Sequence, residues 1–125
     1  VLAQQVVQTS LGGYQSVDEL LLPGGRIYEQ RNFIYKAIND IPGLSAVKPK
    51  AGLYIFPKID REMYRVDDDE QFVLNFLKQE KVLLVHGRGF NWKEPDHFRI
   101  VYLPRVEELA QIQEKMTRFL KQYKR

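Results

Sequence analysis

The absences in this sequence narrow what it can do. Its 125 residues include no cysteine, which excludes disulfides, thiolate metal sites and thiol nucleophiles. No apolar stretch approaches the roughly 18 residues that a membrane span requires, and no signal peptide is visible. This pattern suits the reducing cytoplasm, so we expect a cytoplasmic location and no membrane partner.

The excess of positive over negative charge is also small. The net charge is only +3, because 19 basic residues are interspersed with 16 acidic ones. A nucleic-acid-binding domain usually gathers its Lys and Arg on one face or in one run. Here the largest basic cluster is the tail Lys121, Lys124 and Arg125. We therefore expect no nucleic-acid partner, although a free-standing module that binds an acidic partner stays open as an alternative.

What is present is the composition of a folded domain. Hydrophobic residues make up 44% of the chain and charged residues 28%, which is ordinary for a globular protein. A chain of this length fits one domain with a real core, which we place at residues 1–125. The sequence begins at Val1 in a segment of helical character with no capping residue before it. We interpret this as a piece cut from a longer protein.

Hydrophobic periodicity predicts an alternation of helices and strands. Helices are expected over residues 1–11, 16–22, 26–41, 67–80 and 105–123, the second from the capping-box spacing of Ser16 and Glu19. Strands are expected over residues 44–47, 53–56, 82–85 and 98–103, with the first two forming a hairpin and the third covered on both faces. We predict an α/β fold of the α+β type, a two-layer sandwich. Its sheet is mostly antiparallel and four-stranded, with helices covering mainly one face.

Arg99 is the most informative polar residue, because it lies within an apolar strand. Alternation places it on one face with Val101 and Leu103, where a partly desolvated guanidinium needs an anion. Its planar fork suits a carboxylate in bidentate contact. Two other interpretations stay open: an Asp or Glu of this domain pairs with Arg99, or the strand is an edge and the side chain reaches water.

The loop before that strand carries two aromatic residues, Phe90 and Trp92. They can line a pocket near Arg99 or merely cap the core. The loop is not a nucleotide-binding loop, because the third glycine of that motif is absent and no helix follows.

Other polar groups carry weaker signals. His86 and His97 lack the helical spacing of metal ligands, and we expect no metal site. Asp96 and His97 are adjacent, so their side chains should point apart and form no dyad. Asp67–Glu70 reads as a solvated helix start rather than a calcium loop. Tyr54 has no distinguishing neighbours, so packing is its default role.

Several short stretches, taken in order, resemble the C-terminal small domain of fold-type-I pyridoxal-phosphate-dependent aminotransferases of the bacterial alanine-aminotransferase kind. Single stretches are unspecific, but the ordered set covers essentially the whole chain. They are Gly12–Ser16, Pro23–Arg26, Tyr28–Asn32, Ile38–Gly43, Gly52–Lys58, Val82–Gly87, Asp96–Val101 and Leu103–Arg105.

The resemblance implies an enzyme that transfers an amino group between an L-amino acid, alanine, and a 2-oxo acid. Pyridoxal 5'-phosphate is held by a lysine of a large domain. That domain is the missing partner of this chain, so the catalytic and cofactor-binding residues lie outside it, and the fragment is expected to be inactive and to bind no cofactor. Residues 1–22 are expected to be the connecting segment, and the complete protein a homodimer.

By its position in the motif, Arg99 is implied to bind the substrate α-carboxylate. His86 stands where relatives often have proline, which leaves the loop shape and side-chain specificity open. A lyase or decarboxylase of the same fold type is the alternative reaction.

Overall fold

Helices and short strands alternate along the chain, which a computed structural model describes from residue 1 to residue 125. The elements in order are α1 (Leu2–Gly12), α2 (Asp18–Leu21), α3 (Arg26–Asn39), β1 (Leu44–Ser45), β2 (Tyr54–Ile55), β3 (Lys58–Ile59), α4 (Asp69–Glu80), β4 (Val85–His86), the 3-10 helix η1 (Gly87–Phe90), β5 (Phe98–Val101), α5 (Val106–Leu120) and the 3-10 helix η2 (Lys121–Tyr123).

The strands form two small antiparallel sheets. One pairs β1 with β3, and the other has the order β2-β5-β4 with β5 in the middle. The predicted hairpin is wrong, since Leu44 pairs with Ile59 and Ile55 pairs with Ile100. Pro57 lies between β2 and β3 and has no N–H to donate, which interrupts the ladder. Beyond it, Lys58 bridges His97 in the same register, while β3 also pairs with β1. The predicted single four-stranded sheet is replaced by two sheets.

Two further local predictions are corrected. The strand expected at residues 82–85 is reduced to Val85–His86, and Leu83 is 75% exposed rather than covered on both faces. The capping box expected before α2 is not formed, because Val17 is the N-cap and offers no side-chain bond. Glu19 instead accepts a hydrogen bond from the hydroxyl of Tyr14.

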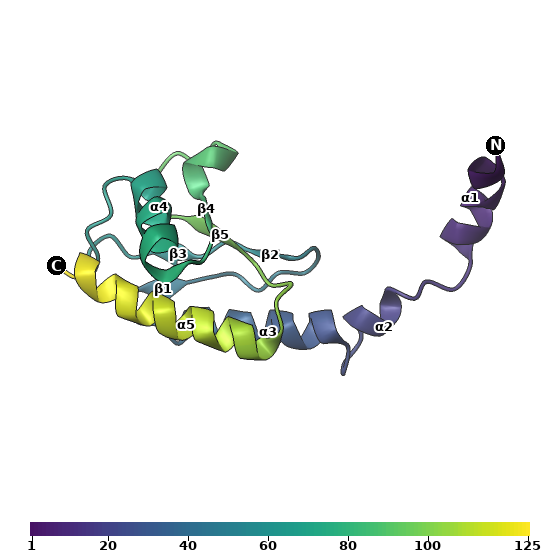
Figure 1. Ribbon diagram of the computed structural model, residues 1–125, viewed down its shortest axis with the longest axis horizontal. Helices are drawn as coiled ribbons and strands as arrows, with labels where there is room; N and C mark the ends of the chain where they lie inside the picture. The colour runs from purple at the N-terminus through teal and green to yellow at the C-terminus, as the bar shows by residue number, and fades with distance from the viewer.

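One hydrophobic core lies on a single side of the sheet that contains β5. The buried residues of this strand and its continuation, Phe98, Ile100 and Tyr102, are at most 2% exposed. Helices α3, α4 and α5 contribute the facing side chains, among them Ile34, Ile38, Phe72, Phe76, Met116 and Phe119. Figure 1 shows α3 and α5 running along the same edge of the body. The helices thus leave the opposite face of the sheet open.

Local chemistry sets the ends of the helices around this core. Asp68 is the N-cap of α4, and its Oδ1 accepts hydrogen bonds from the backbone N–H groups of Glu70 and Gln71 at 2.9 and 3.2 Å. The helix ends where Lys81 adopts a left-handed conformation with φ of 58°. Arg118 of α5 then donates to the carboxylate of Glu80, which joins the two helices.

The N-terminal helices stand apart from the body. Figure 1 shows α1 far from the sheets, with α2 between α1 and α3. Neither helix has a buried residue, and Leu2 and Leu11 are 81% and 79% exposed. The folded core therefore begins at α3. No helix of the chain has the length and apolar character needed to cross a lipid bilayer.

Candidate functional site

Arg99 lies in the central strand and faces away from the helices. Burial alternates along β5: Phe98 and Ile100 are buried, Arg99 is partly exposed, and Val101 is 36% exposed. All three core helices lie on the side of Phe98 and Ile100. The alternative of an edge strand is wrong, since β5 is flanked by β2 and β4.

Two aromatic rings contact the guanidinium of Arg99. Its central carbon lies 4.3 Å from the ring centroid of Tyr54 and 4.4 Å from that of Phe90. Tyr54 pairs with Val101, which makes it the diagonal neighbour of Arg99 on the same face. Phe90 comes from the turn after β4, so the rings approach from the two strands that flank β5. These distances are those of cation–π contacts.

The guanidinium has no anionic partner within the chain. None of the ion pairs includes Arg99, and its buried Nε donates to no acceptor. The interpretation in which an Asp or Glu of this domain neutralises Arg99 is therefore wrong. The largest cavity, about 520 Å³, lies elsewhere, beside β1 and β3, and includes Asp60 and Asp96. Arg99 lies outside this cavity, on the sheet face opposite the buried Phe98 and Ile100.

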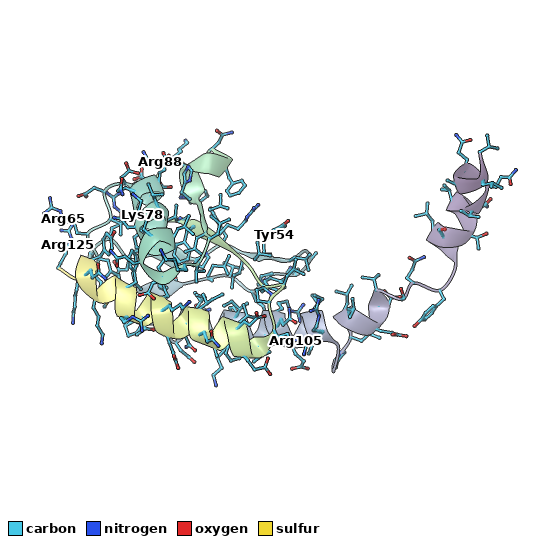
Figure 2. The ribbon with its side chains drawn as sticks, viewed as in Figure 1. Tyr54, Arg65, Lys78, Arg88, Arg105 and Arg125 are labelled. Atoms are coloured by element: carbon cyan, nitrogen blue, oxygen red, sulfur yellow. The ribbon has the colours of Figure 1, made fainter.

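One end of the turn that carries Phe90 is anchored to helix α4 by Arg88. The carboxylate of Asp69 accepts from the backbone N–H of Arg88 at 2.8 Å and from its Nε at 2.5 Å, and Asp68 accepts from the same guanidinium at 2.7 Å. Figure 2 shows Arg88 beside the N-terminal end of α4 and Tyr54 beside β2. Burial alone would raise the pKa of Asp69, but these hydrogen bonds outweigh it and hold the pKa below its ordinary value. The expectation of a wholly solvated helix start is wrong for Asp69, which is 1% exposed.

The other end of the turn is anchored by Trp92. Its indole N–H donates to Asp96 at 2.9 Å, and the same Asp96 oxygen lies 2.7 Å from Nδ1 of His97. Burial again opposes the ionised form, yet the bonds from His97 and Trp92 keep the pKa of Asp96 below its ordinary value. The expectation that Asp96 and His97 point apart is wrong, because β5 begins only at Phe98 and strand alternation does not apply before it.

Trp92 therefore faces a different part of the surface from Phe90. Its ring lies 4.4 Å from that of His97 and 5.8 Å from that of Phe56, and no contact joins it to Arg99. Of the two aromatic residues singled out in the sequence, the structure brings only Phe90 onto the guanidinium. Tyr54, which sequence reasoning left as a packing residue, takes the other position.

Gly87 fits the turn tightly against the strand. Its N–H donates to the carbonyl oxygen of His97 at 2.8 Å, and a Cβ built on Gly87 would lie 2.8 Å from that same oxygen. Only glycine permits this approach without a shift of the backbone.

The class of protein follows from solved structures. No family model matches the chain. A crystal structure of an aminotransferase from Escherichia coli matches with a TM-score of 0.92 and 57% identity, covering 100% of this chain and 31% of that one. An alanine aminotransferase from Pyrococcus furiosus matches with a TM-score of 0.69 and 41% identity. The match covers 78% of the present chain and 24% of the Pyrococcus chain. The fold is that of a segment of an aminotransferase.

Curated relatives narrow the comparison to alanine aminotransferases. The chain is 58% identical over 123 residues to the glutamate-pyruvate aminotransferase AlaA of Escherichia coli, which is 98% of this chain and 30% of the relative. It is 50% identical over 124 residues to the alanine aminotransferase of Mycobacterium tuberculosis, 99% of this chain and 29% of the relative. The chain thus spans about 30% of the length of the relatives it matches. It is similar to alanine aminotransferases over about 30% of their length, which confirms the resemblance seen in its motifs.

The residues of this chain do not by themselves fit a pyridoxal phosphate site. Of the ten lysines, all but Lys115 are exposed. Lys115 donates its ammonium to the carbonyl oxygen of Glu80 at 2.9 Å, so it is engaged in joining two helices. No group of three or more His, Asp or Glu side chains is placed to hold a metal ion. The chemistry that this chain offers is therefore concentrated at Arg99.

Proposed function

We propose that this chain is the small domain of a pyridoxal-phosphate-dependent alanine aminotransferase and that Arg99 binds the α-carboxylate of the amino acid substrate. The observation that carries the proposal is a guanidinium without any anionic partner, held on an open face, in a chain 58% identical to a glutamate-pyruvate aminotransferase. A half-buried cation of this kind is stabilised when a carboxylate meets it.

The chemical contribution of Arg99 is binding and orientation. Each charge-assisted hydrogen bond to a carboxylate contributes about 1.5–3 kcal/mol. Two parallel bonds from one planar guanidinium also fix the direction of the bound carboxylate, and with it the direction of the substrate α-carbon. In this proposal Phe90 lines the site beside Arg99, and Trp92 contributes by anchoring the turn that carries Phe90.

A large domain outside this chain supplies the lysine and the cofactor, and residues 1–22 connect to it. The substrates are L-alanine and a 2-oxo acid, and the protein is a cytoplasmic homodimer. Amino-group transfer is favoured over elimination or decarboxylation because the relatives at 50–58% identity carry aminotransferase names.

The test is made in the complete enzyme. Replacing Arg99 with Ala should raise the KM for L-alanine about tenfold to a few hundredfold, because bonds to the carboxylate are lost. Cofactor binding, followed by its visible absorbance, should stay nearly unchanged. Arg125→Ala is the matched control, since this exposed side chain lies at the opposite end of the domain from Tyr54 (Figure 2). An unchanged KM in Arg99→Ala removes Arg99 from the substrate site.

A further inference from the structure

We infer that Tyr54 and Phe90 are positioning residues that hold the guanidinium of Arg99 ready for a carboxylate. Their contact with Arg99 is observed directly, at 4.3 and 4.4 Å. The functional half of the inference rests on the proposed role of Arg99. The experiment below separates the two.

The starting point is that nothing else fixes this side chain. Arg99 takes part in no ion pair, and its Nε makes no hydrogen bond. An arginine has several rotatable bonds, and on an open sheet face it would sample many rotamers, with an entropic cost on binding. The two rings are the contacts that select one orientation.

Aromatic rings hold an arginine without using its donors. The attraction acts through the ring face on the cation, whereas the N–H groups lie in the plane of the guanidinium. A Glu or Asp in place of either ring would occupy the same N–H groups that a substrate carboxylate needs. Two rings therefore fix Arg99 and leave its hydrogen-bonding edge free.

Both rings are themselves held by structure around them. Tyr54 is fixed by strand pairing, with Val101 opposite it and the carbonyl oxygen of Leu53 accepting from the N–H of Tyr102 at 3.0 Å. Phe90 ends η1, and this turn is anchored at one end by Arg88.

At the other end the turn is anchored by Trp92, whose indole donates to the buried Asp96. A short loop anchored at both ends keeps its aromatic residue over the same strand position. Sequence alone assigned neither of these supports.

The variants are chosen to separate the ring from the rest of the side chain. Tyr54→Leu and Phe90→Leu remove the ring contact, and each should raise the KM for L-alanine in the complete enzyme about two- to thirtyfold. Tyr54→Phe keeps the ring and should restore most of the lost affinity, since no hydrogen bond uses the Tyr54 hydroxyl. Tyr35→Leu is the matched control, because its ring faces Lys48 instead, at 5.8 Å.

A second readout reports on Arg99 without any enzyme assay. The Nε–Hε signal of Arg99, observed by NMR in this chain, should carry a ring-current shift in the wild type and in Tyr54→Phe. It should move toward the position of an exposed arginine in Tyr54→Leu and in Phe90→Leu. An Arg99 signal that is unchanged in both leucine variants overturns the inference, whatever the role of Arg99.

The same pair of measurements distinguishes the two proposals. If the leucine variants move the Arg99 signal but Arg99→Ala leaves the KM for alanine unchanged, the contact stands and the proposed function fails. If Arg99→Ala raises the KM while the leucine variants move neither the KM nor the signal, the function stands and the positioning role fails.

Discussion

At the scale of single residues, the turn between β4 and β5 depends on a close backbone contact. The backbone nitrogen of Gly87 and the carbonyl oxygen of His97 are 2.8 Å apart. A Cβ on residue 87 would lie 2.8 Å from the same oxygen, which is too close for a methyl group. Gly89 belongs to the same turn, yet a Cβ there would meet only the side chain of His86, at 3.2 Å. The two glycines therefore have different requirements although they are two residues apart.

This difference gives a direct prediction. Gly87→Ala should lower the free energy of unfolding by about 1–3 kcal/mol, since the backbone of the turn must shift to make room. Gly89→Ala should have a clearly smaller effect, because a half-buried side chain can move aside. Chemical denaturation of both variants measures this, and equal losses would contradict the close-contact argument.

Sequence reasoning at this scale identified Arg99 but not its surroundings. Strand alternation was enough to place a guanidinium opposite the core-facing Phe98 and Ile100. It could not supply Tyr54, because that contact depends on which strand pairs with β5 and in which register, and pairing is not encoded locally. Nor could it tell that Asp69 is buried while its neighbour Asp68 is exposed.

At the scale of elements, the helices were predicted well and the strands were not. The bounds of α3, α4 and α5 lie close to the predicted ones because helical periodicity is a local signal repeated over many residues. Four of the five strands have only two residues, which is too short for alternation to be distinctive. Their partners are chosen by packing, and β3 lies beyond the expected strand at 53–56, after Pro57.

The junction of α4 with the turn makes stability depend on acidity. The pKa of Asp69 in the folded chain lies below its ordinary value of 3.8, so ionised Asp69 favours folding. That stabilisation is fully present above about pH 4 and is lost as the pH falls through the folded-state pKa. Asp69→Asn should lower the free energy of unfolding at pH 7 by about 1–3 kcal/mol, because one of the two bonds from Arg88 to Asp69 loses its acceptor oxygen and the negative charge facing the guanidinium is removed.

The difference between wild type and Asp69→Asn should shrink when denaturation is repeated near pH 3. Asp67→Asn is the control, since Asp67 and its partner Arg65 are both exposed and such pairs contribute about 1 kcal/mol or less. If the two chains differ in free energy of unfolding by the same amount at both pH values, the charge of the Asp69 carboxylate does not cause the stabilisation.

At the scale of the whole molecule, the two ends of the chain differ in their relation to the core. Residues 1–16 bury nothing, and α1 stands away from the body (Figure 1). At the other end, the ring of Tyr123 lies 5.1 Å from those of Phe72 and Phe119, and its carbonyl oxygen accepts from the N–H of Arg65. At the C-terminal end Tyr123 packs against the core, whereas no residue of α1 is buried.

Truncation should expose this difference. Deleting residues 1–16 should change the free energy of unfolding by less than about 1 kcal/mol, because no apolar surface is buried there. Deleting residues 121–125 should lower it by about 2–4 kcal/mol through the loss of the Tyr123 ring. Chemical denaturation of the two truncated chains measures both changes. A large loss of unfolding free energy from the N-terminal deletion would contradict the structure.

The chain alone should form no specific cofactor adduct. Mixed with pyridoxal phosphate, it should show only weak Schiff-base absorbance with labelling spread over several lysines, because nine of the ten are similarly exposed and Lys115 is already bonded to a carbonyl. Borohydride reduction followed by mass spectrometry tests this. Stoichiometric labelling of one lysine would contradict the absence of a cofactor site.

Asp69 has a consequence that extends beyond the turn it anchors. It is the first residue of α4 and also the acceptor for Arg88, so any displacement of that helix carries the turn, and Phe90, relative to β5. The orientation of the guanidinium is thereby coupled to core packing beneath α4. Substitutions at Phe72 or Phe76, which are remote from solvent, should therefore move the NMR signal of the Arg99 side chain although neither residue contacts the guanidinium.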